Sequence, residues 1–230
     1  MDIKQEMEKL LNKLNEMRTS TLGADVIQII PKISDVNEYI DSIGKLADDL
    51  KLDSAWQCLA EGKDVEKSIN ELYNYVSDRE RAFFISNEFK KINLSNSVLA
   101  SSVIALIVGK VVKENRKCTH KETIILNALG NMTDYDLKNF KLMMDKAIEE
   151  LVGYTVINIF KLDKENRDNY KYTLHLCANV GLFLTESDII GKESEEDDFE
   201  AVYAGLHYVV IDTSYALLGY MNEVKQLLNY

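Results

Sequence analysis

The stretch GLFLTESDIIGKESEEDDFEAVYAGLHYVVIDTSYALLGYM, residues 181–221, holds the signals that decide the fold of the C-terminal half. Its two ends, GLFLT and HYVVI, are rich in β-branched and aromatic residues, which is typical of strands. Asp212 and Thr213 follow the second strand as candidate N-caps of a closing helix. Between the strands, residues 186–200 carry eight carboxylates against Lys192 alone. The stretch therefore predicts two strands joined by an acidic loop, and then a helix.

Upstream of this stretch the pattern alternates between helix and strand. HKETIILNALGNM, residues 120–132, begins with a capping-box pattern from Thr119 to Glu122 and predicts a helix. DYDLKNFKLMMDKAIEEL, residues 134–151, predicts a second helix that reaches about Val152, with Gly153 placed to end it. YTVINIFKL, residues 154–162, predicts a strand, and YTLHLCANVGLF, residues 172–183, is apolar at a helical period before it turns toward strand.

The order from Thr119 onward resembles a winged helix-turn-helix. The phrases YTLHLCANVGLF and VVIDTSYALLGYM are similar to the third helix and to the closing strand and helix of such domains. The resemblance implies that residues 116–230 form a winged-helix-like α+β region, with residues 186–200 as its wing. The implied recognition helix offers only Lys171, His175 and Asn179 toward base edges, and the acidic wing would repel phosphate. Winged helices also serve as protein-binding and dimerising modules, and that use fits the charge.

Residues 1–115 are expected to form a helical region. An apolar stripe at three- and four-residue steps predicts an amphipathic helix over 3–17, and similar spacing predicts a long helix over 63–93. A helix over 95–113 is apolar on all sides, which favours a buried position. A membrane-active use of residues 95–112 stays as an alternative, although a bilayer needs about 20 apolar residues and this stretch contains several serines.

Composition bounds the function classes. The 230 residues include 46% hydrophobic residues, ten glycines and one proline, and this scarcity of helix breakers favours a mostly α fold. The net charge of −11 disfavours a nucleic-acid partner. Met1 leads straight into a charged run, and the three widely spaced cysteines suit a reducing compartment, so we expect a cytoplasmic protein.

Two clusters are candidate contact sites. The acidic run is a candidate for protein contacts through Glu193, Glu195, Glu196, Asp197, Asp198 and Glu200. The second cluster is basic and consists of Lys110, Lys113, Arg116, Lys117 and Lys121. It is expected at a helix C-terminus, where cations favour the helix dipole. It could otherwise contact nucleic acid, anionic lipid or the acidic run itself.

Catalytic and metal-binding patterns are weak. Neither a glycine-rich phosphate loop, a nucleophile elbow nor an HExxH motif occurs, so we expect no enzyme, no catalytic residues and no cofactor. Cys118 with His120 and His175 with Cys177 could supply four zinc ligands, but their one-residue spacing is not the usual gap. Core and surface roles are therefore the preferred interpretation, and no metal is expected.

These observations together favour a non-enzymatic protein-binding or regulatory protein that acts through protein contacts and forms a homo-oligomer. Small accessory proteins of bacteria or phages, including defence and counter-defence factors, share this lack of motifs, although no residue carries that comparison. A DNA-binding transcriptional regulator and a membrane-active effector are the alternatives.

Overall fold

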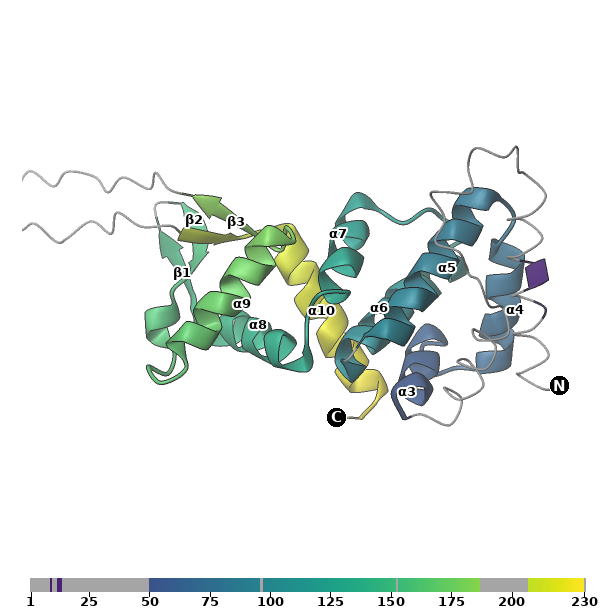
Figure 1. Cartoon of the computed structure of the whole chain (residues 1–230), viewed down its shortest axis with the longest axis horizontal. Coiled ribbons are helices and arrows are strands. Elements are labelled where there is room, and N and C mark those ends of the chain that lie inside the picture. The colour runs from purple at the N-terminus through teal and green to yellow at the C-terminus, as the bar shows by residue number, and fades with distance from the viewer. Residues whose placement is uncertain are drawn as a thin grey trace, which may run out of the picture. The chain divides into compact units, whose positions relative to one another are not determined.

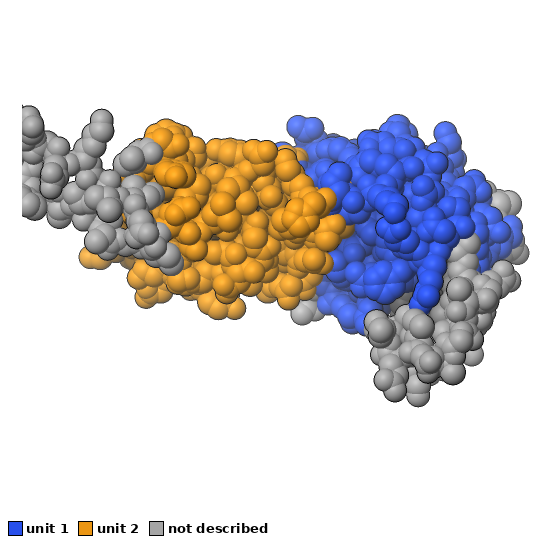
Figure 2. Space-filling view, turned by 90° about the horizontal axis from the view of Figure 1, so that it is seen from above, with its two compact units in different colours: residues 1–119, 220–230 blue, residues 120–219 orange. Residues whose placement is uncertain are grey.

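The computed structural model describes residues 9, 12–13, 50–95, 97–151, 153–186 and 207–229. The chain divides into two compact units, coloured separately in Figure 2: Met1–Thr119 with Tyr220–Tyr230, and His120–Gly219. The sequence places the division after residue 115, and in the structure the first unit reaches Thr119 and also includes the last residues of the chain. Helix α10 (Asp212–Leu227) contributes residues to both units. The amphipathic helix expected over 3–17 lies almost entirely outside the described residues.

The described part of the first unit is helical (Figure 1). Its elements are α3 (Leu50–Leu59), α4 (Val65–Tyr75), α5 (Arg79–Leu94) and α6 (Val98–Lys113). The prediction of one long helix over 63–93 was wrong, since α4 and α5 are separate helices. Asp78 interrupts them: its backbone is extended and its carboxylate accepts a hydrogen bond from the Arg81 backbone N–H at 3.0 Å. A short Asp side chain that caps a new helix competes with continuation of the old one.

Helix α6 forms the core of the first unit. The Ser97 hydroxyl caps it by accepting from the Ala100 N–H at 2.8 Å, and its apolar residues from Ala100 to Val112 are buried. Helix α3 packs closely against α6 at Gly109. A Cβ added to Gly109 would lie only 2.2 Å from the Leu59 carbonyl oxygen. Among the described residues, no helix combines the length and the apolar character that crossing a membrane would require.

The second unit begins with two helices and contains a third. These are α7 (His120–Leu129), α8 (Asp134–Lys146) and α9 (Arg167–Asn179). Thr133 and Asp136 form a reciprocal capping box at the start of α8. The second oxygen of the buried Asp136 carboxylate accepts from the Thr173 hydroxyl at 3.2 Å, so the cap of α8 is also a contact with α9.

An antiparallel sheet of four strands lies beside α8 and α9. The strands are β1 (Ile148–Leu151), β2 (Tyr154–Ile157), β3 (Phe183–Glu186) and β4 (His207–Val210), in the order β1-β2-β4-β3. One face packs on the helices: Phe183 stacks on Phe140 of α8, with ring centroids 5.7 Å apart, and Tyr208 contacts His175 of α9.

The second helix of this region is shorter than its sequence predicts. The helix expected over 134–151 ends at Lys146, and Ile148–Leu151 instead form strand β1. Gly153, with a φ of 81°, closes a tight turn to β2 rather than ending a helix. Ile148 and Leu151 suit a helical stripe and a strand alike, and the pairing with β2 decides between the two. The strand expected over 154–162 stops at Ile157 and is followed by the 3-10 turn η2 (Ile159–Lys161).

The fold class is the expected one: the protein is mostly helical, with a small antiparallel sheet in its C-terminal half, consistent with α+β. Strand β4 and helix α10 also follow the prediction made from residues 207–221.

Candidate functional site

The acidic run lies outside the described residues. The structure places only the ends of the segment that contains it: β3 ends at Glu186 and β4 begins at His207, and these two residues are paired across the strands. The candidate protein-contact residues Glu193, Glu195, Glu196, Asp197, Asp198 and Glu200 all belong to this β3–β4 connection. Their role stays a prediction.

The basic candidates are all described, and each of them contacts a carboxylate. The pairs are Lys110 with Glu223 at 2.6 Å, Lys113 with Glu61 at 3.0 Å, Arg116 with Glu114 at 2.5 Å, Lys117 with Glu80 at 2.6 Å, and Lys121 with Asp212 at 3.4 Å. The hydrogen bond that Lys113 donates to the Glu61 carboxylate is also the main cause that raises the pKa of Lys113. A cation that is already paired with a carboxylate contributes less free energy to binding a phosphate, since the existing ion pair must be broken or shared.

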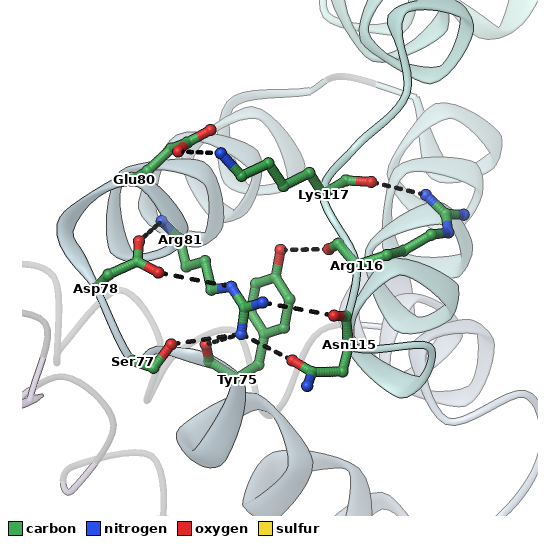
Figure 3. Close-up of polar contacts among 8 residues, drawn as sticks. All are labelled: Tyr75, Ser77, Asp78, Glu80, Arg81, Asn115, Arg116 and Lys117. Carbon is green, nitrogen blue, oxygen red and sulfur yellow. Dashed lines mark hydrogen bonds and ion pairs between the residues drawn. The ribbon is translucent and has the colours of Figure 1, made fainter.

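Arg116 and Lys117 are held in place by a polar cluster between the α4–α5 turn and the chain that follows α6 (Figure 3). The Arg81 guanidinium donates to the Asn115 side-chain oxygen at 2.7 Å and lies 4.6 Å from the centroid of the Tyr75 ring. The Tyr75 hydroxyl donates to the Arg116 carbonyl at 2.8 Å, and burial raises the pKa of this phenol. These contacts stabilise the left-handed backbone of Asn115, which has a φ of 48°. The polar cluster therefore has a structural role, which is to hold the loop after α6.

The implied recognition helix is α9, and two of its three candidate side chains are engaged within the chain. Lys171 donates to Asp168 at 3.0 Å, and a ring nitrogen of His175 lies 2.7 Å from the Tyr208 hydroxyl. Asn179 is the last residue of α9 and is exposed. None of the three forms a pair of donors positioned for a base edge.

The two His–Cys pairs do not form a common site in the part of the chain that the structure describes. His175 and Cys177 both lie in α9, where a two-residue step changes the face: His175 is exposed and Cys177 is buried. No group of three or more His, Cys, Asp or Glu residues able to hold a metal ion occurs among the described residues.

The sequence did not single out the second face of the sheet, which turns away from the packed rings of Phe140 and Phe183. The strand register places the following residues on this outer sheet face: Glu149, Leu151, Tyr154, Val156, Leu184, Glu186, His207 and Val209. The two central valines, Val156 and Val209, are only 1% and 7% exposed. Tyr154 and Leu184, which flank them, are 45% and 52% exposed.

The outer sheet face is therefore apolar in its centre and acidic toward two edges. Glu149 of β1 accepts from Lys161 and Asn158, and these two hydrogen bonds hold the pKa of its carboxyl below the usual value despite burial. Glu186 stands at the end of β3, where the acidic connection begins. Two-residue alternation in FLTE and YTVI could have indicated two faces, but only the strand order brings these faces together.

The comparisons with known proteins found no relative: no family model, no curated protein and no solved structure matches the chain.

Proposed function

We propose that this is a non-enzymatic protein-binding protein, with a regulatory or accessory role, that recognises a basic protein partner through its acidic β3–β4 connection. One observation carries the choice of a protein over a nucleic acid. Each of the five basic candidates, Lys110 to Lys121, lies within hydrogen-bonding or ion-pairing distance of a carboxylate of the same chain. Phosphate contacts need cations that are free to replace condensed counterions.

The proposed scaffold is winged-helix-like. Two features support it: the β3–β4 pair follows α9, and β4 lies between β2 and β3 in the sheet. The acidic connection then occupies the place of the wing. In this proposal the scaffold presents carboxylates where a DNA-binding relative would present basic residues, and this arrangement suits a protein surface rich in Lys and Arg.

Neither alternative is favoured by a specific observation. A DNA-binding regulator would use the basic cluster, whose members are paired, or α9, whose Lys171 and His175 are engaged. A membrane-active effector would have to release α6, whose apolar residues are buried in the first unit. A homo-oligomer remains part of the proposal, and light scattering measures it directly.

Affinity capture from the native host, with the full chain as bait, tests the proposal. The matched variant neutralises the acidic run by Glu→Gln and Asp→Asn changes at Glu193, Glu195, Glu196, Asp197, Asp198 and Glu200. We expect a basic protein that wild type retains at 150 mM NaCl, that high salt elutes, and that the neutralised variant fails to retain. A shift of labelled duplex DNA at low salt, abolished by Lys113→Gln and Lys117→Gln together, would instead support the regulator.

A further inference from the structure

Helix α10 passes from one compact unit to the other. Its residues up to Gly219 belong to the second unit, and those from Tyr220 onward belong to the first. Gly219 therefore lies at the boundary between the units and also near the middle of the 16-residue helix. Glycine is less favourable than alanine in a helix interior, because its backbone loses more conformational freedom on folding. A helix with no need to bend would gain stability from alanine at this position.

The backbone and the packing around Gly219 do not require a glycine. Gly153 and Gly181 have a positive φ, of 81° and 79°, which favours glycine, and Gly109 admits the close approach of α3. At Gly219 the backbone is helical, and a Cβ would meet nothing within 4 Å among the described residues. The property that sets this glycine apart from alanine is thus the conformational freedom that it gives to α10.

Each half of α10 is fixed to its own unit. In the second unit the Ser214 hydroxyl donates to the Leu182 carbonyl oxygen. In the first unit Lys110 pairs with Glu223 at 2.6 Å, and its ammonium lies 5.3 Å from the centroid of the Tyr220 ring. Each of these contacts joins residues of a single unit, so bending of the helix at its boundary residue breaks none of them.

The chain also crosses between the units after α6. Figure 3 shows Asn115 and Arg116 held on the first unit by Arg81 and Tyr75. Three residues, 117–119, separate them from the start of α7 in the second unit. Two bodies joined at two points rotate about the axis that passes through both points, whereas a single linker would leave all directions open. The connectivity therefore favours a hinge with one axis.

We propose that Gly219 is a hinge about which the two units change their relative orientation, with residues 117–119 as the second pivot. Hinges concentrate the change of φ and ψ in a few residues, often small ones, while the bodies on either side keep their internal contacts. This inference goes beyond the proposed function and does not depend on the identity of any partner.

Double electron–electron resonance on the full chain tests the hinge by measuring the distance distribution between two nitroxide labels. One label is attached at Lys67→Cys in the first unit and the other at Asp168→Cys in the second, where the native side chains are 75% and 95% exposed. Cys118→Ser removes the accessible native thiol, and the buried Cys58 and Cys177 stay unlabelled.

We expect a broad distance distribution for the labelled protein with Gly219. Gly219→Ala should narrow it, because alanine lowers the population of conformers that are bent at this residue about fivefold. A distribution of equal width with glycine and with alanine overturns the hinge.

Asn222→Ala is the matched control. It raises the helix propensity of an exposed residue of α10 that lies within the first unit, three residues beyond the boundary. We expect the width of the distribution to stay as broad as with the native residue. If Asn222→Ala narrows the distribution as much as Gly219→Ala does, the stability of the whole helix is the cause, and the assignment of the hinge to Gly219 is overturned.

Discussion

Replacing Gly109 by alanine tests whether the close crossing of α3 and α6 holds the first unit together. In an unobstructed helix interior this change gains about 1 kcal/mol of intrinsic helix propensity. Here the new Cβ would lie 2.2 Å from the Leu59 carbonyl oxygen, whereas ordinary van der Waals contact begins near 3.4 Å, so α3 must retreat by about 1 Å. The obstacle is backbone and cannot swing aside as a side chain would. Overpacking of this kind costs about 1–3 kcal/mol, and a backbone obstacle lies at or above the upper end.

We therefore expect Gly109→Ala to lower the free energy of unfolding by about 2 kcal/mol after the propensity gain is subtracted. Trp56, the single tryptophan of the chain, lies on α3 with its ring 5.7 Å from that of Phe89, so its fluorescence in a urea titration reports this region. Gly219→Ala in α10 is the matched control, because a Cβ there meets nothing within 4 Å and stability should rise by up to about 1 kcal/mol. If Gly109→Ala were as stable as Gly219→Ala, the crossing would not constrain the unit.

Three further predictions concern a buried carboxylate and the cysteines. Glu88 is buried on α5: one carboxylate oxygen accepts from Lys91 at 2.9 Å, and the other has no partner among the described residues. Glu88→Leu removes the buried charge, so the free energy of unfolding in urea titrations should stay unchanged or rise. Lys91→Met leaves the carboxylate buried without its cation, so the free energy of unfolding should fall by about 3 kcal/mol. Equal losses would contradict this asymmetry. In native protein at pH 8 a thiol reagent should label Cys118 alone, because burial raises the pKa of Cys58 to about 11 and that of Cys177 further. Between pH 9 and pH 11 the Cys58 thiol ionises in the unfolded chain but keeps its proton in the native protein. The free energy of unfolding is therefore unaffected by this thiol below pH 9 and falls as the pH rises toward 11. In Cys58→Ala the free energy of unfolding should fall less over this range.

Local signals in the sequence predicted those helices and strands whose formation depends on residues close together in the chain. The charge-free run of residues 94–109 identifies a buried helix, and the β-branched residues before Asp212 identify β4 and the start of α10. The acidic composition also placed the charge of the second unit in the β3–β4 connection. In these cases the decisive physics, helix capping, periodicity or hydrophobicity, acts within a few residues.

Tertiary structure decided everything that depended on pairing between distant residues. Residues 148–151 satisfy a helical and a strand pattern equally, and β2 makes them a strand. The basic residues from Lys110 to Lys121 form a cluster in the sequence. In the folded chain their charges are paired with carboxylates of distant residues, namely Glu223, Glu61, Glu80 and Asp212. The outer sheet face exists only once β4 lies between β2 and β3. A linear pattern gives the faces of one element, but ion pairs and surfaces depend on which elements pack together, and that choice follows from the free energy of the whole fold.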